Sequence, residues 1–179
     1  MTFARIRALA IVGVLVIAAL VLTTMAIIRD RQTHRPAEAA CSAAEIPADM
    51  RLLEPKDIKL NVYNATDKAG LAERVANDFK ARKFIVDPAQ ARNDPLGRAV
   101  TGVGVVRFGP KAVGAAWVVR ANLLNDATLE FDIKRADDVV DVVLGPGYKQ
   151  LGTFTEVNQA LAAAGPAKLP PGTCDSGLR

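Results

Sequence analysis

The chain has 179 residues, enough for one ordinary domain with appendages. Its formal net charge is +4, but residues 1–40 hold five arginines and two acids, which leaves 18 basic and 17 acidic side chains in the remainder. Because a nucleic-acid-binding domain carries a marked positive charge and this remainder is nearly neutral, the composition excludes that class of protein.

The first predicted element is an uncharged apolar helix over residues 8–28. A helix of this length covers roughly 30 Å, the thickness of the hydrocarbon core of a bilayer. We expect it to span the inner membrane as an uncleaved anchor, with residues 1–7 in the cytoplasm. A cleaved signal peptide is the alternative, but the apolar run exceeds the roughly 7–15 residues of a typical signal-peptide core.

Residues 29–55 are polar, rich in alanine and interrupted by prolines, which predicts an extended stem. The two cysteines, Cys41 and Cys174, lie on either side of the predicted domain. This placement suits a disulfide, and disulfides persist outside the reducing cytoplasm, so we expect the domain on the extracytoplasmic side. Two unrelated free thiols are the alternative, because the cysteine count alone does not establish pairing.

Hydrophobic periodicity predicts a domain over residues 56–150, followed by a helix and a tail over 151–179. A turn over residues 64–67, in which Thr66 or Asp67 caps a helix, follows the first strand. A loop is expected over residues 89–101. Strands are expected over 58–63, 84–86, 103–108, 129–133 and 139–144, and helices over 71–83, 111–124 and 155–164. This order favours an α+β fold, a two-layer sandwich with a mixed sheet and its helices on one face.

Several patterns resemble catalytic or metal sites without the residues that such sites need. The glycine spacing from Gly109 to Gly114 matches a phosphate-binding loop, but alanines follow where Lys and Ser or Thr are required. The single histidine, His34, lies in the predicted stem, and the acids at 137, 138 and 141 are typical of a solvated strand edge. We therefore expect no catalytic residue, no metal and no cofactor.

Two predicted helix starts are the best candidates for ligand contacts. Asn64 and Thr66 lie in the turn before the first helix of the domain, where free backbone N–H groups can bind an anion or a polar group. Gly109 and Lys111 lie at the start of the next helix. Simple capping of the helix is the alternative function of the Asn64 turn.

The strings VYNATDKAGLAERVANDFKARKFIV, VVRFGPKAVGAAWVV and ADDVVDVVLGPGY resemble, in order, three parts of the LytR C-terminal domain family. Lys83 stands where that family often has glycine. The resemblance is to stand-alone, membrane-anchored members, and it implies a non-catalytic role in the integrity of the cell envelope. The implied partner is a cell-wall polymer, either peptidoglycan or an attached glycan. The alternative is a scaffold that docks or regulates envelope-assembly proteins.

Overall fold

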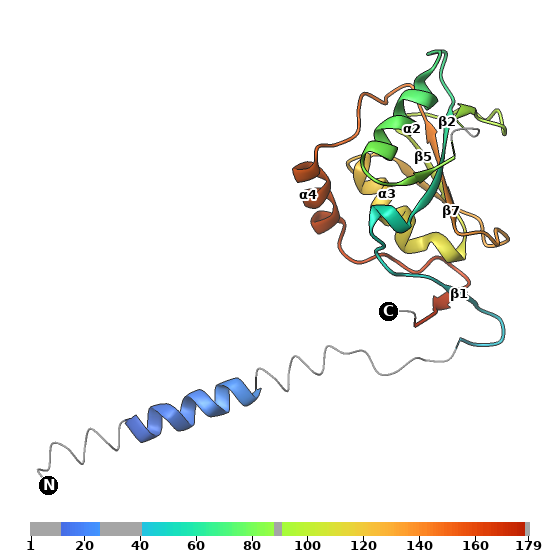
Figure 1. Cartoon of the computed structure of the whole chain (residues 1–179). Helices are drawn as coiled ribbons and strands as arrows, with labels where there is room; N and C mark the ends of the chain where they lie inside the picture. Colours follow the sequence, from blue (N-terminus) through green and yellow to red (C-terminus); the bar gives the residue numbers. More distant parts are fainter. Residues whose placement is uncertain (1–11, 26–40, 88–90, 178–179) are drawn as a thin grey trace, which may run out of the picture. The chain divides into compact units, whose positions relative to one another are not determined.

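The computed structural model describes residues 12–25, 41–87 and 91–177, which belong to two compact units, Met1–Ala39 and Ala40–Arg179. The first unit contains a helix over residues 12–25 (Figure 1). Residues 8–11 and 26–28 of the predicted span, and residues 29–40 of the predicted stem, lie outside the described residues. Within the described ranges, no helix has both the length and the apolar character needed to cross a bilayer.

The second unit is built on a mixed six-stranded sheet (Figure 1). Its strands are β2 (Lys59–Asn64), β3 (Ile85–Val86), β4 (Arg92–Asn93), β5 (Gly104–Phe108), β6 (Thr128–Phe131) and β7 (Val139–Leu144). They follow the order β3-β2-β7-β5-β6, and β4 also pairs with β2. Strand β5 runs antiparallel to β7, whereas the other pairings are parallel. The mixed α+β sheet is confirmed, and β4 lies where only a loop was expected.

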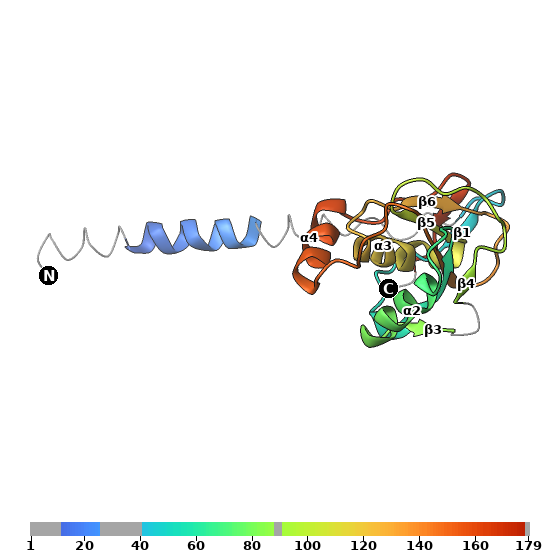
Figure 2. The same ribbon diagram turned by 90° about the horizontal axis from the view of Figure 1, so that it is seen from above.

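The two inner helices are α2 (Leu71–Ala81) and α3 (Val113–Asn122), and both pack on the same face of the sheet (Figures 1 and 2). Alternate residues of the strands, such as Leu60 and Val62, point into this core and are almost fully buried. Two short 3-10 turns, η1 (Pro55–Asp57) and η3 (Pro110–Ala112), precede β2 and α3. The last helix, α4 (Phe154–Ala164), lies against the outer side of α3.

The caps of α2 differ from the predicted ones. The residue before the helix is Gly70, with φ 70°, so neither Thr66 nor Asp67 is its N-cap. At the other end Lys83 adopts φ 75°, and the N–H of Phe84 donates to the carbonyl oxygen of Phe79 at 3.1 Å. Lys83 therefore occupies the left-handed position that glycine usually fills after a helix.

A small second sheet joins the two ends of this unit. Strand β1 (Ile46–Ala48) pairs in parallel with β8 (Thr173–Asp175), and Ala48 is fully buried. These segments lie in the predicted stem and the predicted C-terminal tail, where no strand was expected. Three-residue strands show too few alternations for a period to be recognised, so this pairing becomes visible only in the folded chain.

Candidate functional site

In the turn that follows β2, the polar side-chain atoms of Asn64 form hydrogen bonds with other residues of the same turn. The Oδ1 atom of Asn64 accepts from the N–H and the hydroxyl of Thr66, at 2.9 and 2.7 Å. Its Nδ2 atom donates to the carbonyl oxygen of Lys68 at 2.9 Å, and the side chain is buried. Asn64 and Thr66 thus form a closed turn at the end of β2. This hydrogen bonding accounts for both residues without a ligand.

Gly109 and Lys111 lie at the opposite end of the sheet from Asn64. Asn64 ends β2 and pairs with Leu144 of β7, which in turn pairs with Gly104 at the start of β5. Because β5 runs antiparallel to β7, the residues that follow β5 lie at the opposite end of the strands from Asn64. The structure therefore does not bring the four predicted contact residues together.

The start of α3 is covered by the backbone of the segment that follows β1. The N–H of Gly114 donates to the carbonyl oxygen of Asp49 at 2.9 Å, and the N–H of Ala112 donates to Gly109 at 3.0 Å. A Cβ atom on Gly114 would lie 1.9 Å from the carbonyl oxygen of Arg51, which shows how closely this segment approaches. The free N–H groups expected here are thus partly occupied, and Lys111 is the candidate contact that stays exposed.

A groove opens beside Lys111, and we call it the basic groove. Its volume is about 680 Å³. Its walls come from β1, from η3 and from the loop between β6 and β7, through Ile46, Pro47, Pro110, Lys111, Ile133, Lys134, Arg135 and Ala136. Prolines and isoleucines contribute apolar surface to its lining, to which three cationic residues also belong. Lys111 was predicted from the sequence as a contact residue, but Lys134 and Arg135 were not, because only the fold brings their loop to η3.

Two of these three cations are exposed and without an ion-pair partner among the described residues. Arg135 pairs with Asp137 at 2.8 Å and with Asp141 at 2.7 Å. Burial opposes the charge of Arg135, but the hydrogen bonds that the guanidinium donates to these two carboxylates outweigh burial and raise the pKa of the guanidinium. Lys111 and Lys134 form no ion pair with any described carboxylate. The groove therefore combines an apolar lining with two lysine ammonium groups that are outside any salt bridge between described residues.

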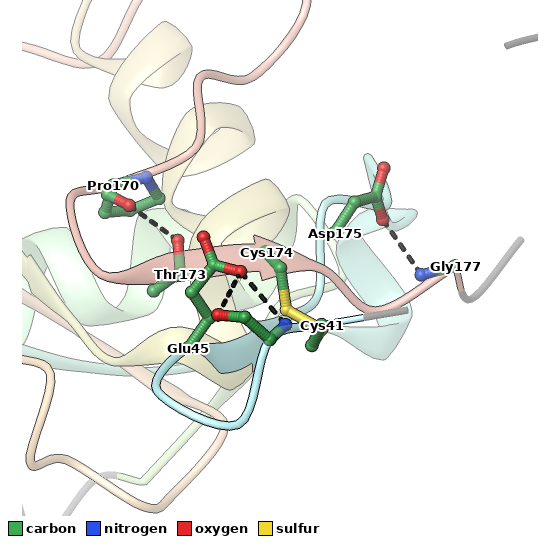
Figure 3. Close-up of a disulfide and its surroundings, with 8 residues drawn as sticks. Cys41, Glu45, Pro170, Thr173, Cys174, Asp175 and Gly177 are labelled. Atoms are coloured by element: carbon green, nitrogen blue, oxygen red, sulfur yellow. Dashed lines mark hydrogen bonds between the residues drawn. A yellow bond between two sulfur atoms is a disulfide. The ribbon is translucent and has the colours of Figure 1, made fainter. Parts of the chain in front are cut away.

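The predicted disulfide is confirmed, and it fastens one wall of the basic groove. Cys41 and Cys174 are bonded, with their Cα atoms 5.6 Å apart (Figure 3). Pro47 of the groove wall is the register partner of Cys174, and Ile46 is the partner of Thr173. The hydroxyl of Thr173 also donates to the carbonyl oxygen of Pro170 at 2.6 Å, which holds the turn before β8. The alternative of two free thiols is excluded.

The helix-free face of the sheet carries a row of polar side chains. The register aligns Asn61, Asp141, Arg107 and Glu130 across four strands. Arg107 donates to Asp94 at 2.7 and 3.1 Å and to Glu130 at 3.1 Å. Burial would raise the pKa of the Asp94 carboxyl, but its hydrogen bonds and the charge of Arg107 outweigh burial and lower it.

The acidic residues considered as a cation site are tied to cations. Asp138 pairs with Lys59 at 2.9 Å, and Asp137 and Asp141 share Arg135. The hydrogen bond from Lys59 is the largest influence on Asp138 and lowers the pKa of its carboxyl. Over the described part of the chain, no three His, Cys, Asp or Glu side chains gather as metal ligands would. Asp137, Asp138 and Asp141 are thus all engaged in salt bridges.

Comparison with known proteins places this domain among envelope proteins. A family model described as LytR cell envelope-related transcriptional attenuator matches residues 57–148. The chain is 28% identical over 183 residues to the cell envelope integrity protein Cei of Mycobacterium tuberculosis, covering 92% of this chain and 82% of that protein. It also resembles the crystallised soluble domain of a conserved hypothetical secreted protein from Mycobacterium marinum. The TM-score is 0.51 at 29% identity, over 70% of this chain and 80% of that one. Since the family model covers just over half of the chain, including every strand of the six-stranded sheet, the chain belongs to the LytR_C family.

Proposed function

We propose that this chain is a cell-envelope protein that contributes to envelope integrity by binding an anionic cell-wall polymer in the basic groove. The observation that carries the proposal is the groove itself, with two exposed lysines, Lys111 and Lys134, that form no salt bridge with a described acid. The family, and the similarity to a protein named for cell envelope integrity, support the envelope role. The chain acts by binding and performs no catalysis.

The chemistry of the groove suits a polymer of sugars that carries acidic groups. Wall polymers bear carboxylates or phosphates, which pair with lysine ammonium groups. Pro47, Pro110 and Ile133 in its lining offer apolar surface against which the carbon faces of sugar rings can pack. Asn64 and Thr66 lie at the far end of the sheet, so a polymer of several units would be needed to reach both places.

The N-terminal segment serves as the membrane anchor in this proposal. Residues 8–28 contain no charged side chain, and a helix over that range has the length of a bilayer core. The disulfide supports an extracytoplasmic position for the domain, because disulfides persist outside the cytoplasm. The stem between the anchor and Cys41 would give the domain its reach toward the wall.

The alternative is a scaffold for envelope-assembly proteins. One observation favours it: β6 forms an edge of the six-stranded sheet, and edge strands can receive a strand from a partner. Trp117, the single tryptophan and a residue type that often anchors partner proteins, is buried, and its Nε1 atom donates to the carbonyl oxygen of Gly165 at 3.1 Å. Docking through Trp117 is therefore not favoured, and β6 is the surface to test.

Co-sedimentation with insoluble cell wall tests the proposal. Residues 41–179, oxidised, are suitable because Ala40–Arg179 is a compact unit and the soluble domain of the relative crystallises alone. We expect Lys111→Ala with Lys134→Ala to weaken binding about tenfold and to reduce its salt dependence. The matched control replaces Lys149 and Lys168, exposed lysines outside the groove, with alanine.

Equal binding by the two double variants would refute the basic groove as the site. If the unsubstituted domain does not bind the wall, the polymer proposal fails. The next test would then be a charge substitution on the exposed edge of β6, scored by capture of a known envelope-assembly enzyme. Asn64→Ala with Thr66→Ala, measured in the same assay, would show whether the far turn adds a second contact.

A further inference from the structure

A second groove lies between α3 and α4, away from the basic groove, and we call it the α4 groove. Its volume is about 540 Å³, within the range of small-molecule sites, roughly 300–1,000 Å³. The two grooves share no lining residue. The α4 groove is lined by Leu52, Leu53, Pro55, Arg82, Phe84, Val118, Asn122, Phe154, Val157, Asn158 and Leu161.

One wall of this groove is α4, which turns apolar side chains toward α3 but buries none of them fully. Phe154, Val157 and Leu161 recur at helical spacing on this side, and Phe154 is 82% exposed. The helix is nevertheless well formed, since Thr153 and Glu156 make a capping box at its start. A stable helix that leaves this apolar side half covered provides a preformed wall for an apolar ligand.

Arg82 is the single charged residue that lines the α4 groove. Its Nη1 atom donates to Oδ1 of Asn122 at 3.0 Å and to the carbonyl oxygen of Gly152 at 2.7 Å. These two bonds hold the guanidinium in place without neutralising it. None of the described carboxylates forms an ion pair with Arg82. The groove thus combines apolar walls with one fixed positive charge.

We propose that the α4 groove binds a fatty acid, with the acyl chain along α4 and the carboxylate on Arg82. The charge complementarity selects an anionic head, because arginine pairs well with a carboxylate and a cationic head would be repelled. A neutral apolar peptide would leave the positive charge without a partner. The single cation and the modest volume match one chain with one charge.

Calorimetric titration of residues 41–179 with dodecanoate, below its micelle concentration, tests this proposal. We expect one molecule bound per domain. Each methylene removed, in decanoate and octanoate, should weaken binding about fourfold, because burial of a methylene contributes about 0.8 kcal/mol. Dodecyltrimethylammonium, which has the same chain and the opposite charge, should bind at least tenfold more weakly.

A matched pair of surface variants locates the site. Leu52 lines the groove and is 52% exposed, whereas Leu96 has the same exposed fraction and lies outside it. Leu52→Glu puts a carboxylate beside the ligand and should weaken dodecanoate binding on the order of tenfold. Leu96→Glu should leave it unchanged. Because both side chains are half exposed, neither substitution disturbs the core, and unchanged urea midpoints would verify this.

Arg82→Gln gives a second, independent readout. It should weaken dodecanoate binding about tenfold and leave the binding of dodecyltrimethylammonium unchanged or improved. No binding of dodecanoate, equal binding of the two detergents, or equal effects of Leu52→Glu and Leu96→Glu would each overturn the proposal. Since Lys111 and Lys134 lie elsewhere, their replacement should not alter dodecanoate binding, so this test and the wall-polymer test can fail separately.

Discussion

Removal of the disulfide should cost the domain a large part of its stability. The pair joins residues 133 positions apart. Its loss therefore raises the conformational entropy of the unfolded chain over nearly the whole domain. The chain-entropy model gives about 5 kcal/mol for a loop of this length at 25 °C. Stability of ordinary domains is about 5–15 kcal/mol, so the domain without its disulfide is expected to be only marginally folded.

Urea unfolding of residues 41–179, with Cys41 and Cys174 both replaced by serine, measures this effect. With a slope of about 1.5 kcal/mol/M, a loss of 5 kcal/mol lowers the midpoint by about 3 M. Reduction of the unsubstituted domain should give the same shift. A decrease below about 0.5 M would refute the reasoning, and it would mean that β1 and β8 detach without any consequence for the six-stranded sheet.

Three further predictions concern the free energy of unfolding, measured by urea titration of residues 41–179. Asp94→Asn breaks the pair with Arg107 and should cost about 3 kcal/mol at pH 7. Because the pKa of Asp94 is lowered by folding, its contribution is fully present above about pH 4 and is lost as the pH falls through the lowered pKa. The difference from the natural domain should therefore shrink as the pH falls below about 4, and a constant difference would contradict this. Gly114→Ala drives a methyl group into the carbonyl oxygen of Arg51 and should cost about 3 kcal/mol, and a loss below 1 kcal/mol would show that the segment moves aside. Lys83→Gly removes a left-handed strain and should raise stability by about 1 kcal/mol, whereas a decrease would contradict the strain argument.

Periodicity in the sequence located most elements of the main sheet and its helices. Val139–Leu144 was predicted with the same bounds as β7, and α2 begins at Leu71 as expected. These elements bury one apolar side with a regular period, and such a period is visible locally. Strands β1, β4 and β8 have only two or three residues and were missed. The equally short β3 was predicted because Phe84, Ile85 and Val86 form an apolar run, whereas the missed strands lie in segments without such a run.

The caps and the candidate contacts were harder to predict than the elements. Thr66 and Asp67 have suitable chemistry for an N-cap, but Gly70 takes that position. The segment at Asp49 covers the start of α3, although nothing near Gly109 in the sequence indicates it. A local sequence pattern indicates which polar groups could cap a helix or bind a ligand. Whether such a group is already hydrogen-bonded depends on backbone segments that are distant in the sequence.

The sequence by itself determined the α+β class, the order of the major elements and the two cysteines available for pairing. Those properties follow from local periodicity, turn residues and composition. The tertiary structure decided that Asn64 and Lys111 lie at opposite ends of the sheet, because β5 runs against β7. It also assembled the basic groove, whose walls come from three separate segments. Such a site depends on the register and direction of the strands. Both are set by pairing between segments that are distant in the sequence, so no single stretch of residues predicts them.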